Sequence, residues 1–158
     1  NNVTATATGA NGNYGVYNYS SSSPTMNNVT ATGTGGLNGY GVYNFSSSPT
    51  MNNVTATATG TNTNYGVANY SSSSPTMNNV TATATGGSNN YGVYNASSSP
   101  TIRNSSITGN TNSIFNVVGS GSTAKVADTA LGGGVAGGVF TCVGAYTTTF
   151  STLGVNCG

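Results

Sequence analysis

The sequence predicts an all-β fold in which short strands stack as the coils of a parallel β-solenoid. The phrase NNVTATATG begins at residues 1, 52 and 78, and the variant NNVTATGTG begins at residue 27. Four prolines recur at spacings of 25, 26 and 25 residues: Pro24, Pro49, Pro75 and Pro100. A unit of this length cannot bury a core alone, so a fixed period of this kind indicates units that stack on one another.

The repeated phrase has the pattern of a β-strand. In residues 3–8, valine and alanine alternate strictly with threonine. Side chains on a strand alternate between its two faces, and β-branched residues favour the pleated backbone. Each unit continues with a Gly- and Asn-rich turn, a YGVYN segment, a serine run that ends in SSPT, and then Met or Ile. Three strand-like pieces per unit predict a coil with three sides.

The apolar positions of the three pieces predict three inner walls. The first wall is the Val-Ala-Ala set of the repeated phrase. The others are Val16, Val42, Val67 and Val93, and then Met26, Met51, Met77 and Ile102. Met26 and Val29 should both face inward although they are three residues apart, so one of Asn27 and Asn28 has to turn a corner. Asparagine tolerates the left-handed conformation that such a corner needs. Stacked corner asparagines can form a hydrogen-bonded ladder.

Aromatic residues form further columns at the same period. Tyr14, Tyr40, Tyr65 and Tyr91 are expected to stack, as are Tyr19, Phe45 and Tyr70. A third column, Tyr17, Tyr43 and Tyr94, is expected to point outward, with Ala68 interrupting it.

The repeat changes after Pro100, which predicts a different end to the stack. We expect coils over residues 1–131, with repeats starting near 1, 27, 52 and 78, a shorter coil from 103 and a partial coil near 124; residues 132–158 are expected to form a C-terminal cap. Cys142 and Cys157 would pair in an oxidising compartment and clip this cap, which favours an extracellular protein. The alternative is two free, buried thiols in a cytosolic protein.

The composition argues against several classes of function. The chain has three charged side chains, Arg103, Lys125 and Asp128, and no histidine. Paired carboxylates, a nucleophile with a histidine base, and the usual sets of zinc or calcium ligands are therefore missing. We expect no enzyme, cofactor or metal site. A net charge of +1 gives no basic field for nucleic acid, and no segment predicts a membrane span.

The repeat units and the end of the chain resemble a known group of proteins. The segments YGVYN, SSSPTM, NNVTATATG and SSPTIRNSSITGN, followed by TCVGAY and a final NC, are similar to bacterial secreted right-handed parallel β-helix repeat proteins of the pectate-lyase-like architecture. The resemblance implies a right-handed coil. Enzymes of that architecture use clusters of aspartate on one sheet, and no position here matches them, so no catalytic residue is implied.

Three hypotheses for function remain, and the first is structural. A neutral, laddered rod would serve as a filament subunit, sheath or stalk. The chain opens within a repeat unit, so Asn1, Asn2 and Val3 would form an unpaired edge that a second copy could extend head to tail. The alternative is that another coil or a cap of a longer protein precedes this edge.

The other two hypotheses concern the surface. Outward Tyr17, Tyr43 and Tyr94 could stack on sugars and make the chain an adhesin or glycan-binding module, or they could simply cover the backbone. The outward threonines could form an ice-binding array, or they could serve only as good strand residues. This array comprises Thr4, Thr6, Thr8, Thr30, Thr32, Thr34, Thr55, Thr57, Thr59, Thr81, Thr83 and Thr85.

Overall fold

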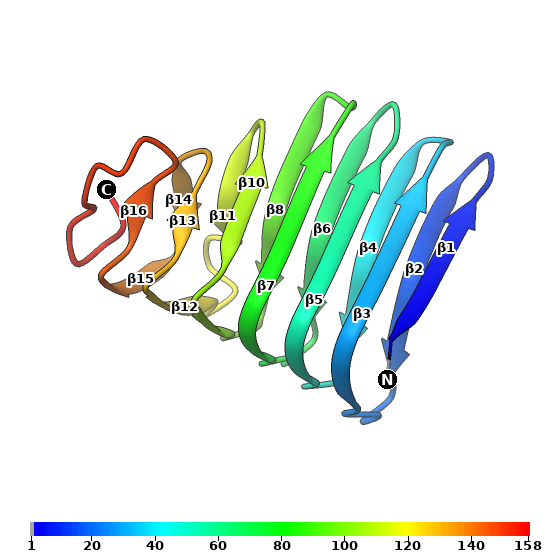
Figure 1. Cartoon of the computed structure of the whole chain (residues 1–158), viewed down its shortest axis with the longest axis horizontal. Helices are drawn as coiled ribbons and strands as arrows, with labels where there is room; N and C mark the ends of the chain where they lie inside the picture. Colours follow the sequence, from blue (N-terminus) through cyan, green and yellow to red (C-terminus); the bar gives the residue numbers. More distant parts are fainter. Residues whose placement is uncertain (1) are drawn as a thin grey trace.

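The computed structural model describes residues 2–158, and this range contains sixteen β-strands and no helix. The strands stack along one axis, from β1 and β2 at one end to β16 at the other (Figure 1). The ladders between them are parallel, with successive repeats displaced by 26, 25 and 26 residues from Val3 to Val29, Val54 and Val80. The chain is therefore a parallel β-solenoid with about 25 residues per turn, as the repeat predicts.

The strands are β1 (Val3–Thr8), β2 (Gly12–Tyr19), β3 (Thr25–Thr34), β4 (Asn38–Phe45), β5 (Thr50–Thr59), β6 (Thr63–Tyr70), β7 (Thr76–Thr85), β8 (Asn89–Ala96), β9 (Thr101–Arg103), β10 (Ser106–Gly109), β11 (Asn112–Asn116), β12 (Thr123–Ala127), β13 (Ala130–Leu131), β14 (Val135–Gly137), β15 (Val139–Val143) and β16 (Tyr146–Thr147).

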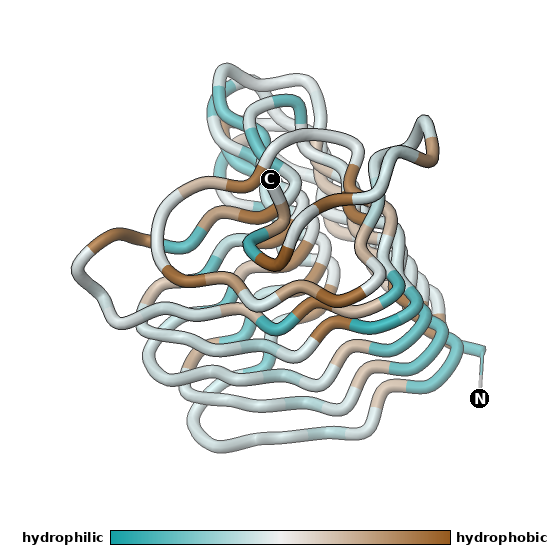
Figure 2. The backbone as a smooth tube through the Cα atoms, turned by 90° about the vertical axis from the view of Figure 1, so that its left-hand side faces the viewer, coloured by the Kyte–Doolittle hydropathy of each residue, from teal (hydrophilic) through white to brown (hydrophobic). Residues whose placement is uncertain are grey.

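The larger of the two sheets has ten strands and turns a corner that divides it into two parts, which we call the long arm and the short arm. The long arm has the order β1-β3-β5-β7-β10-β13-β16, and β9, β12 and β15 lie beside it as the short arm. In β3, β5 and β7 one strand serves both arms and bends at Asn28, Asn53 and Asn79. Together with the second sheet, the two arms give each coil three sides (Figure 2).

The corner between the arms is made by asparagine, which confirms the expected turn. Asn28, Asn53 and Asn79 have φ angles of 54°, 53° and 53°. This left-handed conformation is one that asparagine tolerates better than most residues. The corner amides also form the expected ladder: Asn53 Nδ2 donates to Asn28 Oδ1 at 3.0 Å, and Asn79 Nδ2 donates to Asn53 Oδ1 at 2.7 Å.

The second sheet has six strands in the order β14-β11-β8-β6-β4-β2. Its glycines allow it to approach the long arm closely. A Cβ at Gly41 would lie 2.7 Å from the backbone nitrogen of Thr57 and 2.5 Å from the carbonyl oxygen of Gly66. Gly15 and Gly66 meet the long arm in the same way. These positions of the second sheet therefore need glycine, because a Cβ would clash with backbone atoms.

The three predicted inner walls are buried from the second coil onward. Met51, Met77 and Ile102 are fully buried, as are Val42, Val67 and Val93. The alanines of the repeated phrase complete the core from the long arm. In the first coil Val3 remains 48% exposed, because β1 pairs with β3 along one edge and no strand within residues 2–158 pairs with its other edge.

A column of buried asparagines also lies inside the second sheet. The column consists of Asn18, Asn44, Asn69, Asn95 and Asn116. Each of the first four donates Nδ2 to the Oδ1 of the next asparagine at 2.8 to 2.9 Å, and Asn116 donates to the Val139 carbonyl at 3.0 Å. The last four are fully buried. Buried polar groups are costly unless they are paired. The ladder satisfies each amide with its neighbours in the stack.

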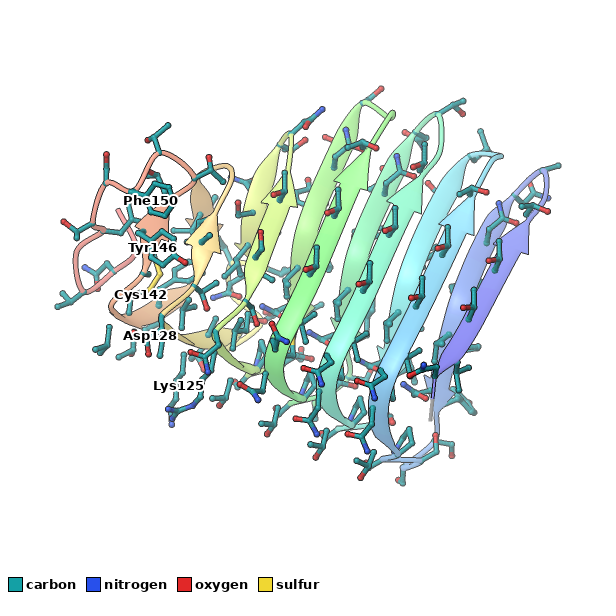
Figure 3. All side chains as sticks on the ribbon, in the orientation of Figure 1. Lys125, Asp128, Cys142, Tyr146 and Phe150 are labelled. Carbon is teal, nitrogen blue, oxygen red and sulfur yellow. A yellow bond between two sulfur atoms is a disulfide. The ribbon has the colours of Figure 1, made fainter. Side chains whose placement is uncertain are left out.

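Coil pairing continues past residue 131, where the sequence predicts that the cap begins. β14 pairs with β11, β15 pairs with β12, and β16 pairs with β13. The buried methionine column runs on through Ile102 and Val126 to Cys142. Cys142 is joined to Cys157, with a Cα–Cα distance of 5.5 Å, which confirms the expected disulfide (Figure 3).

Candidate functional site

The outer side of the long arm carries the predicted threonine array, which we call the threonine face. The twelve threonines stand in three columns that run across β1, β3, β5 and β7. Within the middle column, Thr6 pairs with Thr32, Thr32 with Thr57, and Thr57 with Thr83. In the next coil Ser106 and Thr108 of β10 extend two of the columns. The repeat thus places one hydroxyl-bearing side chain over another in every coil.

The hydroxyls of the threonine face are accessible. Thr30, Thr55 and Thr81 are exposed, and the two columns beside them are partly exposed. Within residues 2–158, the threonine hydroxyls that hydrogen-bond to protein atoms belong to other positions, namely Thr61, Thr111, Thr129, Thr147 and Thr149. The hydroxyls of the array are therefore free to bind an external partner.

The outer side of the second sheet is aromatic, and we call it the tyrosine face. It comprises Tyr14, Tyr17, Tyr19, Tyr40, Tyr43, Phe45, Tyr65, Tyr70, Tyr91, Tyr94 and Phe115. The rings of Tyr14, Tyr40 and Tyr65 stack in sequence, with centroids 4.6 and 5.0 Å apart. Tyr19 also stacks on Phe45 at 5.6 Å. The first column confirms its predicted stack. The second is confirmed only for Tyr19 and Phe45, because the ring of Tyr70 lies against Tyr43 and Tyr94 instead.

The outward ladder Tyr17, Tyr43 and Tyr94 is continuous, in contrast to the predicted gap at Ala68. Tyr70 lies two residues beyond Ala68, and its ring stacks on Tyr43 at 5.2 Å and contacts Tyr94 at 5.4 Å. Ala68 is fully buried. A tyrosine from the neighbouring column thus fills the space that alanine leaves, which strand register alone does not reveal.

Crowding of the phenol groups resists their ionisation. Burial, together with the neighbouring phenols of Tyr17 and Tyr14, raises the pKa of Tyr43 from 10.0 to about 12. Burial is also the main cause of the raised pKa values of Tyr40 and Tyr70. These buried phenols therefore resist ionisation and offer rings and hydroxyl donors rather than charge.

The three charged residues lie on the short arm or at its corner. Arg103 ends β9, Lys125 lies in β12, and Asp128 takes a corner position with a φ of 47° (Figure 3). A hollow of about 130 Å³ is lined by both cations together with Ala127 and Val143. Ala127 pairs with Arg103 on one side and Val143 on the other, so the hollow lies over the smallest side chain of that column.

The C-terminal end exposes several apolar side chains. Val139, Val143, Phe150 and Val155 are 64 to 83% exposed, and the Phe150 ring stacks on Tyr146 at 5.8 Å (Figure 3). A hollow of about 370 Å³ lies between residues 131–135 and the disulfide-bonded Cys157. The apolar core at this end is therefore covered less completely than the core between two repeated coils.

The structure describes two of the three residues of the predicted assembly edge, Asn2 and Val3. Asn1 lies outside the described residues, and Asn2 is exposed. Val3 lines a hollow of about 220 Å³ with Thr25, Met26, Asn27 and Val29, where the apolar core meets the surface. A further coil stacked on β1 and β2 would cover these groups, whatever chain it came from.

The chain has few acidic or basic side chains, and no candidate metal site is found among the described residues. Residues 2–158 contain no cluster of three or more His, Cys, Asp or Glu side chains that could hold a metal ion. They also contain no helix long and apolar enough to span a membrane.

The fold defines the chain as a parallel β-solenoid repeat protein. No protein-family model and no curated protein sequence matches it. Its function must therefore be argued from the three outer faces and the two ends of the stack.

Proposed function

We propose that this chain is a non-enzymatic, extracellular structural repeat protein. The main support is the continuous stacking of identical residues, above all the buried amide ladder from Asn18 to Asn116. Each amide is satisfied only when the coils above and below are in register, so bending or shearing the stack breaks several buried hydrogen bonds together. Such a rod suits a stalk, sheath or filament.

Composition and covalent chemistry support the other parts of this proposal. The single acidic side chain and the lack of histidine leave few groups for acid–base or nucleophilic catalysis. The Cys142–Cys157 disulfide favours an oxidising compartment, because cytosolic thiols are kept reduced.

We further propose that copies of the chain associate head to tail. The exposed Val3 and the hollow beside Met26 leave apolar surface and unpaired strand edges at one end of the stack. The other end exposes Val139, Val143 and Phe150. Contacts between two different ends of a molecule generate filaments when the arrangement does not close into a ring, as in copies stacked along one axis.

Negative-stain electron microscopy and sedimentation test the association. The wild-type chain should form fibres as its concentration rises, and V3K should shorten or abolish them because a charge then lies in the stacking surface. V118K is the matched control, since Val118 is 76% exposed in the turn after β11. Monomers at every concentration would refute self-association, while the single-chain rod would stand.

The tyrosine face supports a second candidate, a glycan-binding or adhesive surface. Its ladder is continuous because Tyr70 covers Ala68, and the surface is neutral and rich in hydroxyl donors. Tyrosine combines a large rigid apolar ring with a polar tip, which suits contact with the carbon and hydroxyl groups of sugars.

Binding to neutral polysaccharides, measured by affinity electrophoresis, tests this candidate. Y17A should weaken retention, because Tyr17 is 52% exposed and its loss leaves the core intact. Y146A is the control, since Tyr146 lies in β16 on the larger sheet. Equal effects of the two substitutions, or no retention of the wild type, would argue against a glycan site on this face.

A further inference from the structure

The threonine face is a two-dimensional lattice of chemically identical groups. Strands in a sheet lie about 4.8 Å apart, and alternate residues on a strand lie about 6.6 Å apart. The register holds across four consecutive strands with threonine in all twelve positions, and Ser106 and Thr108 continue it. Repeats of this size in two directions are comparable with the oxygen–oxygen repeats on faces of crystalline ice.

Each lattice point presents a methyl group beside a hydroxyl in a restricted orientation. Threonine is branched at Cβ, so few χ1 rotamers are open to it on a strand. The hydroxyls of the array form no hydrogen bonds to other groups within residues 2–158, as described above. Water can therefore bind to each hydroxyl while the neighbouring methyl limits the positions open to it.

The layer beneath the lattice is rigid. Ala56, Ala58 and Ala82 of the same strands are fully buried. The backbone of Thr57 meets Gly41 of the second sheet so closely that a Cβ on this glycine would lie 2.7 Å from the Thr57 nitrogen. Close packing of this kind resists local deformation. The strands thus hold the threonines at a fixed spacing, which lowers the entropy cost of binding a partner.

The charge distribution indicates an uncharged partner. Arg103, Lys125 and Asp128 lie on the short arm or at its corner, and the threonine face carries no ionisable side chain. Its twelve positions also hold no aromatic ring; the rings of the repeated coils lie on the second sheet. A flat, neutral, periodic surface offers little to a single sugar or peptide side chain, whereas a periodic water lattice can occupy every point of it at once.

We propose that the threonine face binds the surface of ice crystals through an ordered layer of water. This inference concerns a different face from the stacking edge and the tyrosine face, so it stands independently of the functions proposed above.

Thermal hysteresis and ice recrystallisation measured on the purified chain test the proposal. The wild type should show hysteresis and shape growing crystals into facets. T57K should remove most of this activity, because a long charged side chain at the centre of the lattice disrupts its flatness and the bound water. T57V, which replaces only the hydroxyl with a methyl group, should reduce it less.

The matched control is T50K, which lies on the same strand, β5, but is exposed on the short arm. It should keep wild-type hysteresis. Circular dichroism checks that each variant is folded; if T57K is not, T57V carries the comparison. The absence of hysteresis in the wild type overturns the proposal, as do equal losses in folded T57V or T57K and in T50K. Retention on a polysaccharide that T57K abolishes, without hysteresis, also overturns it and assigns the face to glycans.

Discussion

From β1 to β8 each coil places the same residues over one another, whereas from β9 onward the strands shorten and the columns change residue type. Met51 lies between Met26 and Met77, but the same column then passes through Ile102 and Val126 to Cys142. The long strands that turn a corner at asparagine separate into pairs such as β9 and β10. Register by repetition is thus confined to the first part of the chain.

The two regions differ in what holds them together. In the repeated coils, buried amides bond from coil to coil and strands pair over as many as nine residues. At the C-terminal end, β13 and β16 pair over two residues, and a disulfide joins Cys142 to Cys157. Where identical side chains no longer supply the register, a covalent link ties β15 to the C-terminal tail.

Removing one amide from the buried ladder should destabilise the repeated coils most. N69A leaves the Nδ2 donor of Asn44 and the Oδ1 acceptor of Asn95 without a partner in the core. Each unpaired buried group costs about 1–3 kcal/mol, so we expect a total loss of about 4 kcal/mol in urea unfolding. N52A, in the more exposed Asn27–Asn52 ladder, should cost about 0.5 kcal/mol. Similar losses in both variants would contradict a special role for the buried ladder.

The second-largest loss of stability is expected when a methyl group is added between the two sheets. In G41A the new Cβ meets backbone atoms of both Gly66 and Thr57, and backbone cannot move aside as a side chain can. We expect a loss of about 3 kcal/mol. G134A serves as the control, because nothing lies within 4 Å of a Cβ at that position. Unchanged unfolding of G41A would show that the sheets are held less closely than the structure places them.

Breaking the disulfide should affect the C-terminal end and leave the repeated coils folded. Closure of a loop of this length stabilises a protein by about 3 kcal/mol on the chain-entropy model, and we expect at most this loss, confined to the end. Hydrogen exchange of the C142S/C157S variant measures it, with faster exchange expected in residues 139–158 and no change in residues 29–96. Equally faster exchange in both regions would mean that the stack unfolds as one unit.

Alkaline pH should weaken the repeated coils through the tyrosine face. Burial raises the folded-state pKa of Tyr43 to about 12, whereas an unfolded phenol ionises near 10.0. The unfolded chain therefore releases this proton first, so the contribution is fully present below pH 10 and is lost as the pH rises from about 10 to about 12. Thermal melts across this range measure the loss. Y43F should show a shallower decline, and an identical decline would assign the effect to other groups.

Much of the fold follows from the sequence because repetition makes register visible. Residues one period apart must stack, so the strand positions, the three inner walls and a corner at one of the two asparagines of each repeated phrase can be derived from spacing alone. The structure places that corner at Asn28, Asn53 and Asn79. The buried amide ladder was also within reach, because Asn18 has the same strand parity as the inward-facing Val16. Its polar character argues for the surface, and only the partner in the next coil makes its burial favourable.

The candidate surfaces also differ in how far they could be predicted from the sequence. The threonine lattice could be predicted to its individual residues, because alternation sets which side chains face outward and the repeat sets their partners. The continuity of the tyrosine face could not, because it depends on the ring of Tyr70 lying over Ala68 between Tyr43 and Tyr94. The hollow that gathers Arg103 and Lys125 has no sequence signal, since the two residues belong to coils that differ in length.

By itself, the sequence set the period, the parallel stacking and the residues that share each column, because residues one period apart must lie over one another. It did not set every face: in the second sheet Gly41 and Val42 are both buried, so strict alternation fails between Tyr40 and Tyr43. Tertiary structure alone decided how far the stack continues toward Cys142, which ring fills the space above Ala68, and where the few charges meet. These features depend on the space left between neighbouring coils, and that space is set by the packing of residues far apart in the chain.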